Sequence, residues 1–220
     1  MTKNPLSAEI IDQAPLRRLA TVVSAVSIAS LTAFAGVANA NPDSNQGGMH
    51  GDPAAAAPYW QEQQQNLSCG EMAVADVVGQ ITGRRISEEE ITNTAENIPS
   101  ASHPGPIYTP SKKTSNHDLP VLLAHYNIGS DTVETNIDGL VRALDQRRKV
   151  IVGVNDRTLW GRGGDHTREN HFVVVTGIDT LEDLVLLNDS GISAGRDERV
   201  TIETFESAWA TSSHFAVLTK

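Results

Sequence analysis

Residues 171–189 read HFVVVTGIDTLEDLVLLND, and this stretch decides the fold class. The runs 171–179 and 184–189 are rich in Val, Ile and Leu and end in Asp or Asn-Asp, as strands typically do. The connection between them, 180–183, is short enough for a hairpin. The stretch therefore predicts two adjacent antiparallel strands.

The segments around this hairpin predict helices before it and further strands beside it. Two other runs rich in aliphatic residues, 149–155 and 214–219, predict strands, and a short helix is expected near 202–209. Apolar spacing and end signals upstream predict four helices, at 69–82, 87–97, 117–126 and 136–147. Helices followed by mostly antiparallel strands make an α+β arrangement.

Two irregular segments are expected to lie at a functional site. Residues 98–117 contain four prolines together with Gly, Ser and His, and irregular segments of this length in compact domains are often functional. Residues 156–169, DRTLWGRGGDHTRE, are expected to rim a cleft. Trp160 in that segment is either a substrate contact or a loop anchor, and the sequence leaves both open.

The amino-terminal segment has the pattern of a secretory signal peptide. Arg17 and Arg18 precede a long uncharged stretch, and the small residues Ala38 and Ala40 follow it. We predict cleavage after Ala40. The alternative, an uncleaved membrane anchor, is disfavoured because Ser, Thr and Gly dilute the apolar run and no basic cluster follows. The protein is therefore expected to be secreted or associated with the cell envelope, by the general or the twin-arginine route.

The chain divides into three segments by composition. Residues 1–40 are the predicted signal peptide, and residues 41–58, NPDSNQGGMHGDPAAAAP, predict a flexible leader because they lack apolar periodicity. Residues 59–220 are long enough for one domain with its own core.

The charge of the chain excludes some classes of partner. It carries 17 basic and 27 acidic residues, a formal net charge of −10, and near −11 once residues 1–40 are removed. An acidic protein without a basic run has no electrostatic attraction for nucleic acid or anionic lipid. We therefore expect no nucleic-acid partner and no membrane association after signal cleavage, and the oligomeric state stays open.

Cys69 is the only cysteine of the chain, so it has no partner for an intrachain disulfide. An unpaired thiol in an exported protein is either a reactive group or a small buried apolar residue. Composition leaves these two interpretations open. The position of Cys69 favours the first, because it starts a predicted helix, whose free N–H groups and dipole favour a thiolate.

Three further residues would supply what a thiol hydrolase needs. His171 opens a predicted strand and could act as the base. Asp189 ends the strand paired with it, so its carboxylate would lie beside the imidazole and orient it. Gln63 lies six residues before Cys69 and could donate to the oxyanion of the tetrahedral intermediate.

This ordered set resembles the C39-like branch of the papain-like cysteine peptidases. The resemblance rests on a glutamine six residues before Cys-Gly and on HFVVVTGID followed by LVLLNDS, and it runs from about residue 61 to the carboxyl end. It implies a papain-like α+β fold in which N-terminal helices, with the cysteine at a helix start, pack on a mostly antiparallel sheet. It also implies the roles of nucleophile, general acid/base, orienting residue and oxyanion donor for Cys69, His171, Asp189 and Gln63.

Two positions depart from the pattern of that family. Glu71 stands where a small residue or proline usually follows Cys-Gly, and Ser190 stands where proline usually follows the aspartate. Neither change removes a catalytic group. The sequence therefore predicts an exported cysteine peptidase acting on a peptide or protein substrate. The alternatives are a cell-wall peptide amidase of related fold and a catalytically inactive C39-like binding domain.

A metal site was weighed against this interpretation. Asp165, His166 and His171 lie close together in the sequence, and zinc binds such residue types. The spacing of the two histidines spans a Gly-rich loop and matches no recognised ligand template. We therefore expect neither a metal nor a cofactor.

Overall fold

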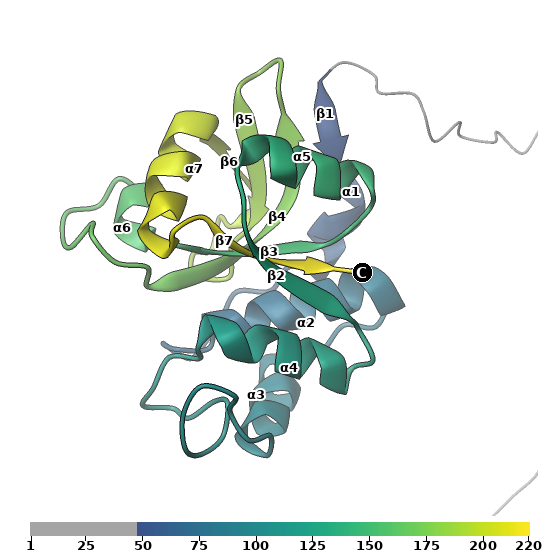
Figure 1. Cartoon of the computed structure of the whole chain (residues 1–220), viewed down its shortest axis with the longest axis vertical. Coiled ribbons are helices and arrows are strands. Elements are labelled where there is room, and N and C mark those ends of the chain that lie inside the picture. The colour runs from purple at the N-terminus through teal and green to yellow at the C-terminus, as the bar shows by residue number, and fades with distance from the viewer. Residues whose placement is uncertain (1–47) are drawn as a thin grey trace, which may run out of the picture. The chain divides into compact units, whose positions relative to one another are not determined.

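The computed structural model describes residues 48–220 (Figure 1). The predicted signal peptide and its cleavage after Ala40 lie outside the described residues. Seven strands form one sheet in the order β2-β7-β3-β4-β5-β6, and β1 pairs with the far end of β4. The strands are β1 Met49–Gly51, β2 Ser130–Glu134, β3 Val150–Val154, β4 His171–Asp179, β5 Leu184–Asn188, β6 Arg196–Thr201 and β7 Phe215–Thr219.

All pairings among these strands are antiparallel, and the helices lie mostly before the sheet in the chain. The α-helices are α1 Pro53–Ala56, α2 Cys69–Thr82, α3 Glu88–Glu96, α4 Leu119–His125, α5 Ile137–Asp145, α6 Asp156–Leu159 and α7 Ile202–Trp209. Short 3-10 turns occur at Ala57–Tyr59, Asn116–Asp118 and Ala210–Ser212. The α+β class expected from the sequence is confirmed.

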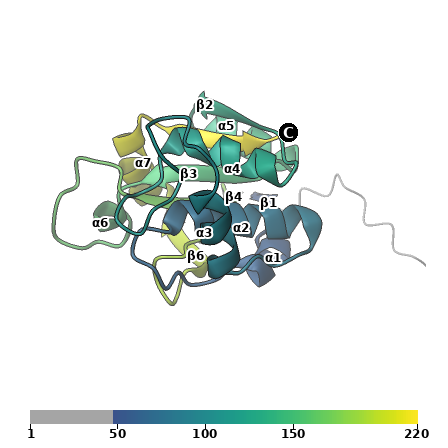
Figure 2. The ribbon, with the colours of Figure 1, turned by 90° about the horizontal axis from the view of Figure 1, so that it is seen from below.

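Helices cover both faces of the sheet, as Figures 1 and 2 show. Side chains alternate between the two faces of a strand, and β4 follows this rule over its buried length. Phe172 and Val174 pack with α2, α3 and α4, whereas Val173 and Val175 pack with α5 and α7. Because both faces are buried, β4 reads as a continuous apolar run rather than as an alternating one.

Helix α2 packs with α3 and α4 on the sheet face that carries Phe172 and Val174. Contacts at its end and with its neighbours fix its position. Gly83 ends it in the left-handed conformation, with its N–H donated to the Gly79 carbonyl at 2.8 Å. A Cβ on Gly79 would lie 2.6 Å from the ring of Tyr59, so glycine allows that close packing. The buried carboxyl of Asp76 accepts a hydrogen bond from Asn188 Nδ2 at 2.8 Å, which ties α2 to the end of β5.

The hairpin predicted for 171–189 is present as β4 and β5, with Val174 opposite Asn188. The other predicted helices and strands also occur, with ends within about two residues of those expected. Beyond residue 58, the strands β2 and β6 and the single-turn helix α6 were missed. Both strands lie at edges of the sheet and are polar, SDTVE and RDERVT, so they lack the apolar signal of a strand.

The prediction of a flexible leader over 41–58 is wrong for its described part. Residues 49–51 form β1 on the edge of β4 that β3 leaves free, and Asp52 caps α1 by accepting from Ala55 N at 3.0 Å. Pro53 occupies the first turn of α1, where its missing N–H costs nothing. Gly and Pro in this stretch therefore mark a turn and a helix start. Among residues 48–220, none of the helices is long and apolar enough to cross a membrane.

Candidate active site

Cys69 is the first residue of α2 and is 3% exposed. Gly70 follows it, and a Cβ there would lie 3.2–3.3 Å from atoms of Leu119, Phe172 and Thr114. Such contacts are tighter than most, so glycine lets the start of α2 approach β4 closely. The consequence is that the thiol lies beside the first residue of β4, which is His171.

His171 bridges Cys69 and Asp189. Its Nε2 is 2.7 Å from Asp189 Oδ1, and because that nitrogen is occupied, Nδ1 is left for the thiol. Burial lowers the pKa of His171, but the charge and hydrogen bond of Asp189, together with the hydrogen bond to Cys69, outweigh it and raise the pKa from 6.5 to about 10. The site therefore favours a protonated imidazole between two acidic groups.

Asp189 is fully buried directly after β5, and its carboxylate accepts three N–H donors. Oδ1 accepts from His171 and from the Gly191 main chain at 2.7 Å, and Oδ2 accepts from Trp160 Nε1 at 2.9 Å. Burial raises the pKa of Asp189, yet His171 and these hydrogen bonds hold it below its usual value. The carboxylate thus stays ionised and is fixed in orientation.

Trp160 anchors its loop at this site, which is one of the two roles that the sequence left open for it. Besides its bond to Asp189, its ring lies 5.3 Å from the His171 ring, centroid to centroid, at 58°. A Cβ on Gly191 would lie 2.9 Å from both rings, so glycine is required there. Trp160 also lines the cavity beside Cys69, where it can contact a substrate.

Gln63 lines the same cavity as Cys69 and is held by the chain that follows Asp189. Its main-chain N–H donates to the Ser190 carbonyl at 2.8 Å, and its side-chain Oε1 accepts from the Ser190 hydroxyl at 3.0 Å. Nε2 donates one proton to the Gln65 carbonyl at 2.9 Å. A second amide proton remains for a ligand. Ser190, where the family pattern has proline, thus fixes which end of the Gln63 amide is the donor.

Glu88, at the start of α3, holds the loop that carries Gln63 and was not anticipated from the sequence. Its carboxylate accepts from Gln64 N at 2.8 Å, from Gln65 N at 3.0 Å and from Ser68 Oγ at 2.6 Å. A Glu-rich helix start looks like an ordinary favourable interaction with the helix dipole, so the pattern gave no reason to single out one glutamate.

Cys69, His171 and Gln63 line one cavity of about 270 Å³. Both irregular segments contribute to its wall, as expected: Lys113 comes from 98–117, and Asp156 and Trp160 come from 156–169. Lys113 is held there by Glu169 at 2.5 Å and lies 4.5 Å above the ring of Phe172. The lining residues are Gln63, Gln64, Gln65, Asn66, Leu67, Cys69, Lys113, Asp156, Trp160, Asn170, His171 and Gly191.

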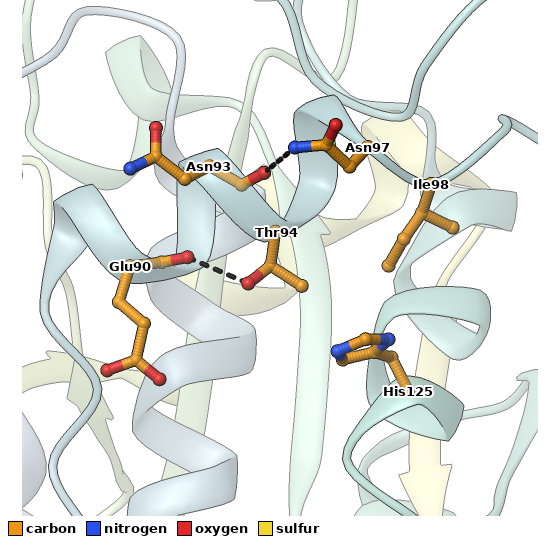
Figure 3. A pocket seen from close by; sticks show the side chains of 6 residues that line it. All are labelled: Glu90, Asn93, Thr94, Asn97, Ile98 and His125. Atoms are coloured by element: carbon orange, nitrogen blue, oxygen red, sulfur yellow. Dashed lines mark hydrogen bonds between the residues drawn. The ribbon is translucent and has the colours of Figure 1, made fainter.

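A second, wider depression lies between α3 and α4 and shares no residue with the first (Figure 3). It measures about 530 Å³, and its lining carries no thiol. The side chains drawn in Figure 3 are those of Glu90, Asn93, Thr94, Asn97, Ile98 and His125. The chemistry of a thiol hydrolase can therefore be assigned only to the cavity at Cys69.

Glu71, which departs from the family pattern after Cys-Gly, is two residues after Cys69 on α2 and so lies on the other side of the helix, about 200° around its axis. It is fully buried, and its Oε1 accepts from the Thr114 hydroxyl in the 98–117 segment. Its Oε2 has no hydrogen-bond partner. Burial and, to a smaller extent, the charge of Asp118 raise its pKa from 4.5 to about 7, against the hydrogen bond from Thr114. The carboxyl thus braces the 98–117 segment against α2.

Glu71→Gln is expected to stabilise the protein increasingly as pH rises from about 4.5 to about 7, and not at lower pH. A carboxyl whose pKa is raised on folding stabilises the folded state fully below its unfolded pKa, ~4.5, and this contribution is lost as pH rises through about 7. The glutamine cannot ionise, so the variant should exceed the wild type by about 2–3 kcal/mol at pH 8 and match it near pH 4. Urea unfolding at both pH values measures this. The exposed Glu203→Gln serves as the control, and a difference that is equal at both pH values would contradict the assignment.

The metal alternative finds no support in the geometry of its residues. His166 Nδ1 contacts the Thr158 hydroxyl at 2.9 Å, and Asp165 accepts from Thr167. His171 is committed to Asp189. Within residues 48–220, no group of three or more His, Cys, Asp or Glu side chains is arranged to hold a metal ion.

The fold is α+β and papain-like: a cysteine at the start of a helix, Cys69, lies beside a histidine on the sheet, His171. Within that class, the chain belongs to the Peptidase C39 like family, whose profile matches residues 54–217. The chain is 39% identical over 228 residues to an uncharacterized protein of Mycobacterium bovis and to one of Mycobacterium tuberculosis. The alignment covers 92% of this chain and 98% of each relative.

Solved structures show the same fold at low sequence identity. The chain is similar to a C39-like peptidase structure from Bacillus anthracis, with a TM-score of 0.58 and 17% identity over 78% of this chain and 97% of that one. It is also similar to the peptidase domain of Streptococcus ComA, a bi-functional ABC transporter involved in quorum sensing. There the TM-score is 0.51, with 17% identity over 73% of this chain and 98% of that domain.

Proposed function

We propose that this chain is an exported cysteine peptidase that cleaves peptide bonds through Cys69, His171, Asp189 and Gln63. The observation that carries the proposal is the imidazole of His171, held on one side by Asp189 and hydrogen-bonded on the other to the thiol at the helix start. Membership of the C39-like peptidase family supports the same chemistry.

In the proposed reaction, Nδ1 of His171 holds the proton of Cys69 while Sγ attacks the scissile carbonyl carbon. The developing oxyanion accepts hydrogen bonds from the free Gln63 amide proton and from the Cys69 main-chain N–H. The C–N bond then breaks, and His171 gives its proton to the leaving amine. Water attacks the thioester with His171 as the base, which releases the acid product and restores the thiol.

Asp189 supports both proton transfers without taking part in them. Its bond to Nε2 leaves Nδ1 facing the thiol, so the ring presents the nitrogen that the reaction needs. Its charge stabilises the imidazolium present in the acyl-transfer step. The three N–H donors to its carboxylate keep Asp189 in the ionised form that this role requires.

The test of the proposed function is a substrate screen with residues 41–220. A proteome-derived peptide library and purified cell-wall peptide fragments are incubated with the wild type and with Cys69→Ala, and new amino termini are identified by mass spectrometry. Cleavage of the library by the wild type alone is expected. Cleavage confined to wall fragments would indicate a wall amidase, and no cleavage of either would indicate a binding domain.

Gln63→Ala is expected to lower kcat by about 10²–10³ while leaving measurable activity, as the loss of one oxyanion donor typically does. KM should change little, because the bond to the oxyanion forms only in the transition state. Gln146→Ala, on an exposed turn after α5, is the control and should behave as the wild type. A change in KM with unchanged kcat would assign Gln63 to substrate binding instead.

A further inference from the structure

Glu198 lies on the edge strand β6, beside the end of β5 that leads into Asp189. In the sheet register Glu198 is opposite Leu187. Asp189 is two residues further on, and side chains two apart along a strand share a face. Diagonal neighbours on one face of an antiparallel pair are within reach of long side chains. Glu198 and Asp189 are therefore placed to meet.

The regular register of β6 ends at Glu198, and a β-bulge lies next to it. The register shifts between Leu187 and Asn188, so that Asn188 faces Arg196 and Asp197 is left over with a φ of 54°. The extra residue puts Gly195, instead of Arg196, opposite Asp189, whose N–H donates to the Gly195 carbonyl at 2.8 Å. Such rearrangements are common where bulges lie next to active sites.

The register brings the carboxyl of Glu198 next to that of Asp189, and a hydrogen bond between the two carboxyls is one cause of the raised pKa of Glu198. Its Oε2 is buried, and no donor among the described residues reaches it. Two carboxylates offer only acceptors, so such a contact requires one proton between them. Asp189 already accepts from His171, Gly191 and Trp160, which favours its ionised form. The proton therefore resides on Glu198.

We propose that Glu198 is a positioning residue for Asp189, an inference that rests on the proposed function. Its protonated carboxyl holds Asp189 at neutral and lower pH. Its ionisation at higher pH adds a negative charge behind the Asp189–His171 pair. The site would then contain a line of four groups, Glu198, Asp189, His171 and Cys69.

The raised pKa of Glu198 is consistent with its contact with Asp189. Burial, and then the charge and hydrogen bond of Asp189, raise its pKa from 4.5 to about 7, against the charge of His171, which lowers it. The effect of His171 on Glu198 is reciprocal, so an ionised Glu198 must favour the imidazolium by the same coupling. Ionisation of Glu198 therefore keeps His171 protonated to a higher pH.

Other charged groups near β6 are engaged elsewhere. Arg199 donates to Asp197 at 3.1 Å, and the guanidinium of Arg196 lies 5.2 Å above the ring of Trp60. Strand β5 carries no ionisable side chain, and Glu203 and Glu206, on the packed helix α7, are exposed. The groups that act on Glu198 are thus Asp189 and His171.

The test is an NMR titration that needs no substrate, so it is independent of whether peptide bonds are cleaved. Side-chain carboxyl carbons of glutamate are followed from pH 4 to 10, and the Glu198 signal is identified by its loss in Glu198→Gln. We expect that signal to titrate near pH 7 and to move to lower pH in Asp189→Asn. Titration in the ordinary range of glutamate, about 4–5, overturns the proposal.

The imidazole signal of His171 supplies the second measurement. Glu198→Gln keeps a donor toward Asp189 but cannot ionise, so deprotonation of His171 should move to lower pH by up to about one unit, a tenfold change in the imidazolium ratio at a fixed pH. Glu71→Gln, which replaces a buried glutamate facing the 98–117 segment, is the matched control and should leave His171 unchanged. Equal shifts in both variants, or none in Glu198→Gln, overturn the proposal.

For an active enzyme, the same effect appears in the pH profile of kcat/KM. The alkaline limb should fall at lower pH in Glu198→Gln than in the wild type, while the acid limb stays in place, because Glu198 is neutral there in both proteins. A purely structural role would lower the whole profile by one factor, and that result would also overturn the proposal.

Discussion

Replacement of Cys69 by alanine is expected to reduce peptide hydrolysis to the uncatalysed background, a loss of at least about 10⁴ in kcat. The thiol is the group in the cavity that hydrogen-bonds to His171, whereas the amine of Lys113 is paired with Glu169 and the Asp189 carboxylate is buried under three N–H donors. Without the acyl-enzyme, neither His171 nor Gln63 has a reaction to assist. Turnover of the best substrate from the peptide screen, followed by chromatography, measures the loss.

The fold of Cys69→Ala should survive, which makes the result interpretable. Cys69 is buried and alanine fits within its volume, so the change leaves a void of one sulfur atom and costs about 1 kcal/mol. Circular dichroism and the urea midpoint verify this. Cys69→Ser is the matched variant, because it keeps a hydrogen-bonding group in nearly the same volume. If either variant with an intact fold still cleaved peptides at a substantial rate, Cys69 would not be the nucleophile.

The core of the fold could be predicted from the sequence because its signals are local. The hairpin of β4 and β5 is two aliphatic runs with a short connection, and α2 is an apolar segment that ends at Gly83. Strand β6 could not be predicted in the same way. Its residues, RDERVT, look like a solvated loop, and only pairing with β5 makes them a strand.

Some residues of the candidate site could likewise be predicted from the sequence, and others could not. His171 and Asp189 were expected side by side because two paired strands place them there, and the resemblance to C39-like peptidases added Cys69 at its helix start. Glu88 and Glu198 contact the site through side chains whose partners are unrelated in spacing, so no spacing rule could identify them. Ser190 follows Asp189 directly, but its bond to Gln63 joins residues 127 apart and could not be read from the sequence. Glu198 in particular lies in a polar strand rich in both charges, RDERVT, where a glutamate is ordinarily read as exposed.

His171→Gln is expected to slow alkylation of Cys69 at pH 6.5 by about 10², because an unassisted thiol is only about one per cent ionised two units below its usual pKa of ~8.5. In the wild type, the protonated imidazole between Cys69 and Asp189 should keep the labelling rate nearly constant from pH 6 to 8. In the variant, the rate should rise steadily and approach that of the wild type near pH 9. Iodoacetamide labelling followed by intact-mass spectrometry measures both curves.

Glutamine is the right replacement because Asp189 is fully buried. His171→Ala would leave that carboxylate without its main partner, and an unpaired buried charge costs about 3–5 kcal/mol, so loss of labelling could reflect unfolding. The amide of glutamine can still donate to Asp189 Oδ1. His125→Gln, at the end of α4, is the control and should label as the wild type does. If the wild type labelled slowly at pH 6.5 and His171→Gln followed the same curve, the thiol would receive no help from the imidazole, and the C39-like fold would here be a binding domain rather than a peptidase.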